Sequence, residues 1–374
     1  MTIAISGTTG ITLDGQFNSA SSMGFKNRLI NSAMVIDQRN AGAASANTIS
    51  GYFLDRWIVG QSTTGKLIAQ QNAGAVTPPV GFGNYLGITS QSSFPVGASG
   101  LYYIQQAIEG FNTSDLEFGT ANAKTITISF QVYSSLTGTF GGSIYNNAGN
   151  RFYPFSYSIS SANTWTSISI TIAGDTTGAW VGATNGAGMW VFFSLGAGTS
   201  FGGTAGAWVA GSFGAGPYAP SGGTSVVGTN GATFYITGVQ LEKGSTATSF
   251  DYRPYGTELA LCQRYAFKRL ADGSVNAYAP FGIGRYYSTT AVQLYVPFPV
   301  TMRTNPSSIT VGGTIYVNDS GFGGADLTSP VLNQTSCDGA TITGGTTSVG
   351  VAGNATTFYA SNTSVASILF SAEL

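Results

Sequence analysis

The hydrophobic period of the chain changes within residues 231–265, and this change constrains the fold more than any other feature of the sequence. Apolar side chains alternate along residues 233–241, as in a β-strand with one face on a core. After Pro254 the spacing lengthens to three and four residues, and Thr257 with Glu258 suits the first turn of a helix. The apolar positions of the predicted helix are Leu259, Cys262, Ala266 and Leu270. A β domain therefore ends here and a helical connector begins.

This change divides the 374 residues into four parts. Residues 1–24 form an extended arm or short strand pair that is too small to fold alone. Residues 25–250 contain a lead-in segment and then short strands separated by turn residues, and residues 251–270 form the connecting helix. Residues 271–374 contain a second set of strands. We expect two β-sandwich, jelly-roll-like domains joined by a short helix and preceded by the arm.

The composition supports an all-β class. The chain has 53 glycines and only 8% charged residues, whereas surface helices need charged side chains on their solvent faces. Hydrophobic residues make up 43% of the chain, which is enough to bury a core. Alternation over residues 126–132 and 168–172 places isoleucine, phenylalanine and valine on one face of each strand. These strands are predicted to face the core of the first domain.

Charge and hydropathy exclude two classes of partner. The net charge is −1 and no basic run occurs, so we expect no nucleic-acid binding, which needs a concentrated basic surface. No apolar stretch approaches the roughly 20 residues that span a bilayer, and the first residues lack the basic and apolar regions of a secretory signal. We therefore expect a soluble chain that is made in the cytoplasm and does not insert into membranes.

The chain contains no histidine, and this absence limits the chemistry that it can perform. Serine and cysteine triads and the usual zinc sites all need histidine. Two cysteines, Cys262 and Cys337, form no metal-binding spacing, and no calcium-loop spacing occurs, so the sequence indicates no metal site and no cofactor. Calcium ligation by serine and aspartate residues near turns stays an open alternative.

Carboxylate catalysis remains open. Asp115 and Glu117 are the best local pair, because they would share one face of a strand over residues 114–118. The alternative interpretation is a solvated sheet edge protected by its charges, and it is the one we favour. We expect a protein that is not an enzyme.

Aromatic side chains are the candidates for sugar contacts, because sugar C–H groups stack on aromatic faces. Trp180 and Trp208 lie beside glycine-rich turns. Tyr286 and Tyr287 point to opposite faces of one predicted strand, so at most one of them belongs to the core. These four residues are the predicted glycan-binding candidates, although for each tryptophan a core position is the interpretation we favour.

Four separated motifs, taken together, resemble a family of bacteriophage tail fibre and virion structural proteins. They are NRLINSAMVIDQRNAG at 27–42, LDRW at 54–57, FYITGVQLEKG at 234–244 with Ala247, Thr248 and Phe250, and RPYGTELALCQRY at 253–265. The resemblance covers about residues 25–310 and is looser elsewhere.

The resemblance implies a carbohydrate-binding-module-like jelly roll in the middle of the chain, assembly as a homotrimer, and a distal C-terminal domain that meets the host surface. It also implies a place in the virion tail. The arm at residues 1–24 would attach the fibre to other tail or baseplate proteins.

Three copies of the predicted helix could bury Leu259, Cys262, Ala266 and Leu270 against one another as a short bundle. A helix packed on its own chain is the alternative. The leading hypothesis for function is a structural and adhesive tail fibre component that contacts host glycans through distal loops. A tail-associated depolymerase with paired carboxylates and a purely structural tail or baseplate adaptor are the alternatives.

Overall fold

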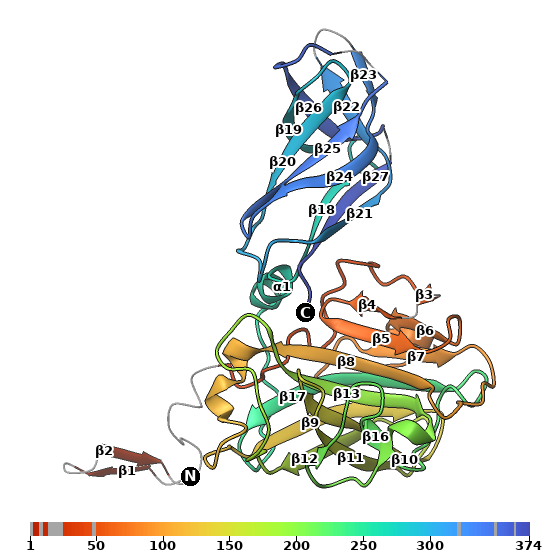
Figure 1. The fold of residues 1–374 in the computed structure, drawn as a ribbon, viewed down its shortest axis with the longest axis vertical. Coiled ribbons are helices and arrows are strands. Elements are labelled where there is room, and N and C mark those ends of the chain that lie inside the picture. The colour runs from red at the N-terminus through yellow and green to blue at the C-terminus, as the bar shows by residue number, and fades with distance from the viewer. Residues whose placement is uncertain are drawn as a thin grey trace.

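Two antiparallel sheets form the larger part of the computed structural model (Figure 1), which describes residues 3–6, 10–13, 25–46, 50–319, 323–347, 350–362 and 364–374. The first sheet has seven strands in the order β15 (Val209–Ala210), β11 (Arg151–Ile159), β10 (Gly138–Asn146), β13 (Ala187–Ala197), β8 (Leu101–Glu109), β5 (Trp57–Gln61) and β4 (Ser50–Leu54). The second has six, in the order β12 (Thr166–Ile172), β9 (Ile126–Ser134), β17 (Thr233–Lys243), β7 (Leu86–Ser90), β6 (Leu67–Gln71) and β3 (Ser45–Ala46).

The core of this sandwich lies between the two sheets. The predicted alternation is confirmed in β9, where Ile126, Ile128 and Val132 are fully buried and Phe130 is nearly so. β12 lies at the sheet edge, and there Ile172 is buried while Ile168 and Ile170 pack only partly against the core. Short elements complete the domain: β14 (Gly202–Gly203), β16 (Ala219–Pro220), η2 (Ala73–Ala75), η3 (Gly110–Asn112), η4 (Ser114–Leu116) and η5 (Thr199–Phe201).

A second sandwich forms the C-terminal part. Its smaller sheet has three strands in the order β18 (Ala266–Asp272), β27 (Val365–Ser371) and β21 (Ser308–Gly312). Its larger sheet has seven, in the order β23 (Gly323–Asp326), β22 (Ile315–Asp319), β26 (Ala355–Ala360), β19 (Pro280–Tyr286), β20 (Ala291–Pro297), β25 (Gly339–Gly345) and β24 (Thr328–Thr335). The described part of the chain is thus mostly β, with a few short helices, as the composition predicts.

The connector differs from the prediction. Helix α1 spans Tyr255–Gln263, and the chain then enters β18 instead of continuing as a helix to residue 270. β18 pairs with β27 along its whole length, from Ala266 opposite Ser371 to Asp272 opposite Val365. The predicted helix was therefore too long. The backbone groups of residues 266–272 bond to β27, a distant strand that a local hydrophobic period cannot reveal.

The arm is described only in part. β1 (Ile3–Ser6) and β2 (Gly10–Leu13) pair as an antiparallel hairpin, which agrees with the predicted strand pair. The rest of the arm prediction lies outside the described residues.

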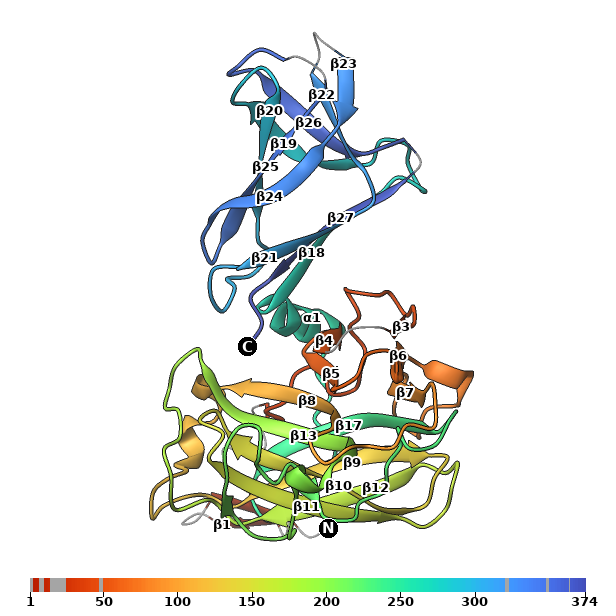
Figure 2. The same cartoon turned by 45° about the vertical axis from the view of Figure 1, so that its right-hand side comes forward.

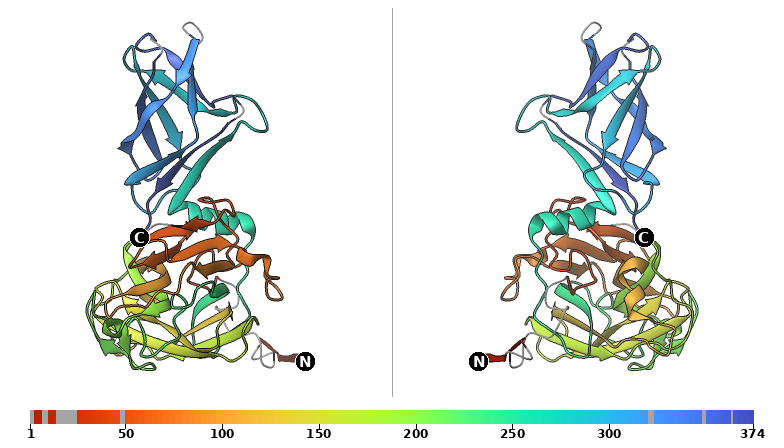
Figure 3. Two further views of the ribbon diagram at one scale, coloured as in Figure 1. Left: turned by 90° about the vertical axis from the view of Figure 1, so that its right-hand side faces the viewer. Right: turned by 90° about the vertical axis from the view of Figure 1, so that its left-hand side faces the viewer.

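The two sandwiches meet end to end, with α1 between them (Figure 2). Ion pairs to two buried glutamates hold this joint together. Glu373 pairs with Arg39 and Arg56, and Glu109 pairs with Arg264 at 2.7 Å. The Arg56 guanidinium also lies 3.5 Å from the centre of the Tyr265 ring. Residue 374 lies at this joint, beside the first sandwich (Figure 3), where the hydroxyl of Tyr52 donates to the Leu374 carbonyl at 2.9 Å.

Candidate functional site

Two cavities flank the short helices η3 and η4, which follow strand β8. The end of β8 is paired with the start of β13, with Glu109 opposite Ala187. Backbone bonds then extend this pairing, from the Gly110 amide to the Gly186 carbonyl and from the Phe111 amide to the Thr184 carbonyl. Gly110 is required there, since an added Cβ would lie 2.3 Å from the Gly182 carbonyl oxygen. The sheet register therefore brings residues 110–120 against the loop before β13.

The carboxylates Asp115 and Glu117 are separated by this local geometry. Residues 114–116 form the 3-10 helix η4 and Glu117 adopts a left-handed φ of 55°, so the predicted strand over 114–118 is wrong. The segment forms turns instead of a strand because Gly110, Asn112 and Gly119, which favour turns, lie close to it in the sequence. Asp115 lines one cavity and Glu117 lines the other.

Each carboxylate is paired with a cation. Arg28 grips Asp115 through two hydrogen bonds of 2.6 and 2.8 Å, and Lys243 lies 3.5 Å from the same carboxylate. Burial tends to raise the pKa of Asp115, but the bonds and charges of Arg28 and Lys243 outweigh it and hold that pKa below its usual value. Glu117 is paired with Lys124 at 2.8 Å. Asp115 is thereby held as a charged hydrogen-bond acceptor.

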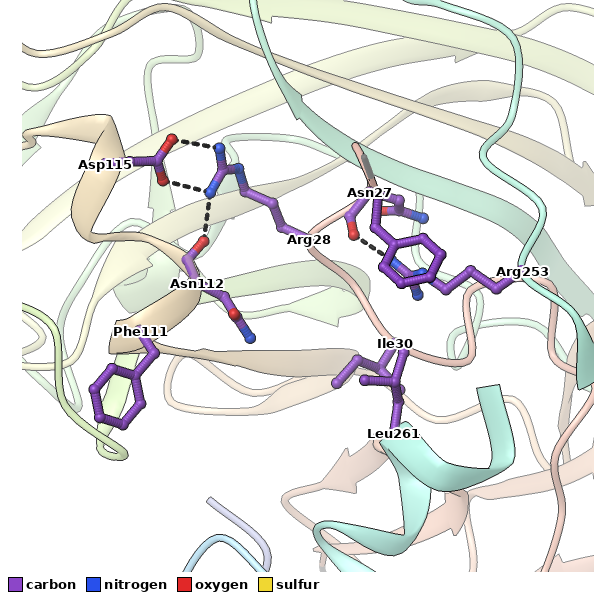
Figure 4. A pocket seen from close by; sticks show the side chains of 9 residues that line it. Asn27, Arg28, Ile30, Phe111, Asn112, Asp115, Arg253 and Leu261 are labelled. Carbon is purple, nitrogen blue, oxygen red and sulfur yellow. Dashed lines mark hydrogen bonds and ion pairs between the residues drawn. The ribbon is translucent and has the colours of Figure 1, made fainter. Parts of the chain in front are cut away.

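The first cavity, of about 300 Å³, lies between the lead-in segment, η3 and α1 (Figure 4). Phe25 and Phe111 line it with 63% and 55% of their surfaces exposed. Arg253 lies 5.4 Å from the centre of the Phe25 ring and donates to the Leu29 carbonyl at 3.0 Å. The remaining lining residues are Asn27, Arg28, Ile30, Asn112, Asp115 and Leu261.

The second cavity, of about 250 Å³, has an aromatic wall and polar neighbours. Trp180 and Phe118 supply the aromatic surface, and Glu117 supplies a carboxylate. The other lining residues are Thr113, Ser114, Thr120, Val181, Gly182 and Met189. A flat apolar surface beside fixed hydrogen-bonding groups is the combination that binds a sugar ring and its hydroxyls.

Trp180 is held in place by its neighbours. Its ring makes edge contacts with Phe118 at 4.8 Å and with Trp208 at 5.5 Å between centroids. Its indole N–H lies 3.3 Å from both the Asp175 carboxylate and the Thr177 carbonyl. Arg151 donates two hydrogen bonds to the Asp175 carboxylate, at 2.7 and 2.8 Å. Burial tends to raise the pKa of Asp175, but the hydrogen bonds from Arg151 outweigh it and hold that pKa below its usual value. The ring is thus positioned before any ligand arrives.

The other predicted sugar contacts lie elsewhere. Trp208 is half-buried between Phe118 and Tyr153, donates to the Ala173 carbonyl at 2.7 Å, and lines neither cavity. Tyr286 is fully buried in the C-terminal core and is therefore out of reach of a ligand, whereas Tyr287 is 50% exposed. Of the four predicted residues, only Trp180 lines either of these cavities.

The predicted bundle residues do not share one helix face. Cys262 is fully buried with Ile30, Ile36 and Tyr265 of the same chain. Its packing therefore agrees with the alternative prediction, in which the helix packs on its own chain. Burial raises the pKa of the Cys262 thiol well above its usual value. Ala266 and Leu270 lie on β18 and not on the helix, with Ala266 buried and Leu270 51% exposed. Leu259 packs partly against the same cluster as Cys262.

The sequence interpretation missed the two exposed phenylalanines, Phe25 and Phe111. Phe111 follows Gly110 in a run of turn residues, and this apolar residue in a turn is the signal that could have found it. Phe25 precedes the first family-like motif and has no such signal.

Two further observations concern the described ranges only. They contain no group of three or more cysteine, aspartate or glutamate residues that could hold a metal ion. They also contain no helix that is both long and apolar enough to cross a membrane.

No protein-family model and no curated protein matches the sequence. Among solved structures, the fold is similar to carbohydrate-binding modules and to a domain of a phage tailspike. The enzymatically active domain of tailspike protein 4 of bacteriophage CBA120 aligns with 12% identity and a TM-score of 0.31, over 58% of this chain and 21% of that chain. This chain therefore spans about one fifth of the tailspike chain.

Two carbohydrate-binding modules align over nearly their whole length. The module TmCBM61, solved with β-1,4-galactotriose, has 9% identity and a TM-score of 0.29, over 59% of this chain and 99% of that chain. The family 11 module of Clostridium thermocellum, solved with a mixed-linked tetrasaccharide, has 11% identity and a TM-score of 0.29, over 55% of this chain and 99% of that chain. Both similarities concern the fold alone.

Proposed function

We propose that this protein is a non-enzymatic carbohydrate-binding component of a phage tail, and that it binds sugar in the cavity beside Trp180. The observation that carries the proposal is the half-buried indole of Trp180, which forms a wall of a cavity of about 250 Å³ that also contains Glu117 and three hydroxyl side chains. A sugar ring can stack on the indole while its hydroxyls donate to the carboxylate.

The charge pairing of the carboxylates favours binding over hydrolysis. A glycosidase needs one carboxyl group with a raised pKa as acid and a second one across the scissile bond. Asp115 has a lowered pKa and a bidentate arginine partner, and it lines a different cavity from Glu117. No specific observation favours the depolymerase alternative.

The place in a phage tail rests on the four sequence motifs and the family that they resemble. Assembly as a homotrimer belongs to the same proposal, since three weak sites acting together give high avidity. Light scattering should then give about three times the 38.4 kDa of one chain, and a mass of one chain would contradict it.

A glycan array tests the binding site. We expect the full chain to bind at least one oligosaccharide on the array. Trp180→Ala should weaken the affinity for it at least about tenfold, and Trp180→Phe should keep part of that affinity. Trp165→Ala is the matched control, because Trp165 is also half-buried but lines neither cavity. Unchanged binding by Trp180→Ala, or no binding by the wild type, would contradict the proposal.

A further inference from the structure

A third cavity, of about 260 Å³, lies on the outer face of the large C-terminal sheet, far from the Trp180 cavity in sequence. It is lined by Ile283, Gly284, Arg285, Gln293, Tyr295 and Thr341, which come from β19, β20 and β25. The register places Arg285 opposite Gln293 and Tyr295 opposite Thr341. The side chains of Arg285, Gln293, Tyr295 and Thr341 therefore share one sheet face, because residues paired across antiparallel strands point the same way.

Tyr295 forms an aromatic surface in this cavity. Its ring lies over Gly339 of β25, since a Cβ added at Gly339 would lie 2.3 Å from the Tyr295 hydroxyl oxygen. The tyrosine is nevertheless 57% exposed, and Ile283 beside it is 71% exposed. A ring held against the sheet with a free face is a platform on which a sugar can stack.

Arg285 brings an uncompensated positive charge to the same cavity. It is exposed, its Nε donates to the Gln293 side-chain oxygen at 3.4 Å, and within the described ranges it forms no ion pair with a carboxylate. None of the residues that line the cavity is acidic. The arginines of the joint differ, since Arg39, Arg56 and Arg264 each pair with a glutamate. The guanidinium of Arg285 is thus free to bind an anionic group in a bidentate way.

We infer that this cavity binds an acidic oligosaccharide, whose sugar ring stacks on Tyr295 and whose carboxylate or phosphate pairs with Arg285. Gln293 and Thr341 are the neighbouring groups for the sugar hydroxyls. The inference extends the proposed carbohydrate-binding function to a second site with a different ligand charge. It does not need the Trp180 cavity to bind.

An array of acidic oligosaccharides tests this site with the full-length chain. The array would carry uronic-acid, sialic-acid and phosphorylated oligosaccharides, each carboxylated one beside its carboxyl-reduced form. We expect at least one acidic probe to bind, and its reduced or dephosphorylated form to bind at least about tenfold more weakly. Binding should also weaken between about 0.1 M and about 1 M salt, because salt screens an exposed charge pair.

Substitutions of the lining residues test whether the acidic oligosaccharide binds in this cavity. Arg285→Gln and Tyr295→Ala should each weaken it at least about tenfold, whereas Lys66→Gln and Tyr255→Ala should not change it. Both control residues lie outside the cavity. Trp180→Ala should leave acidic binding intact, so that failure of the two sites can be told apart. Absence of any acidic ligand, or acidic binding that persists in Arg285→Gln, would overturn the inference.

Discussion

At the scale of single residues, Arg56 is the most consequential side chain of the joint. It is 1% exposed, pairs with Glu373, and donates to the Ala107 carbonyl at 2.6 Å. Glu373 keeps its pair with Arg39 when Arg56 is removed, so the cost is that of the lost charged hydrogen bonds, about 1.5–3 kcal/mol, and not that of an uncompensated buried charge. We expect Arg56→Met to lower the free energy of unfolding by that amount in urea denaturation.

Arg285→Gln provides the control for this measurement, because Arg285 is exposed and forms no ion pair with a described residue. Its effect on the free energy of unfolding should stay within about 0.5 kcal/mol. If Arg56→Met cost as little as Arg285→Gln, the joint would not depend on its buried pair.

Asp55, next to Arg56, should make stability depend on pH. Burial raises the pKa of its carboxyl group to about 6, from an ordinary value of 3.8. The folded chain therefore binds this proton more tightly than the unfolded chain, so the stabilisation is complete below the unfolded pKa and is lost as the pH rises through about 6.

The expected loss from this one group is roughly 2–3 kcal/mol between about pH 4 and about pH 7. Comparing the pH dependence of the free energy of unfolding for wild type and Asp55→Asn isolates it, because the variant cannot titrate. Parallel pH profiles for the two proteins would show that Asp55 has an ordinary pKa.

At the scale of elements, the strand β18 is the point where local pattern and structure diverge. Alternation in β9 predicts burial correctly because the same residues that set the period also face the core. The spacing of Ala266 and Leu270 suits a helix equally well as a strand, and the partner that decides between them, β27, lies about a hundred residues later in the chain. No local period contains that information.

For the same reason, the candidate site could be predicted only in part from the sequence. Trp180 could be identified from the sequence as an aromatic residue beside glycine-rich turns. Trp180 lies beside residues 113–120 because of the register between β8 and β13, and a single sequence does not reveal that register.

A pair of variants tests the strand assignment of residues 266–272. Phe267 is 8% exposed in the C-terminal core, so Phe267→Ala should cost about 3–5 kcal/mol of unfolding free energy. Leu270 is 51% exposed, so Leu270→Ser should change it by less than about 0.5 kcal/mol and leave the molecular mass unchanged. Loss of oligomers in Leu270→Ser would instead place this side chain in an interface between chains.

At the scale of the whole molecule, the two sandwiches should unfold together. Besides the pairs of Glu373, a reciprocal contact joins them, in which Arg303 donates to the Asn185 carbonyl and Asn185 donates to the Arg303 carbonyl, both at 2.9 Å. We expect one calorimetric transition for the wild type and two for the double variant Glu373→Gln, Arg303→Ala, because the domains then lose their coupling. Two transitions in the wild type would contradict this coupling.

The arrangement of the domains also separates the two proposed sugar sites. The Trp180 cavity belongs to the first sandwich, and the Arg285 cavity lies on the outer face of the larger sheet of the second. One chain could therefore contact neutral and acidic parts of a surface glycan at once, which raises avidity without new contacts at either site.

A crystal structure of the full chain with an oligosaccharide selected on the array tests the central claim most directly. The account predicts a sugar ring stacked on Trp180, with a sugar hydroxyl within hydrogen-bond distance of the Glu117 carboxylate. An oligosaccharide bound elsewhere on the first sandwich, with the Trp180 cavity empty, would contradict it.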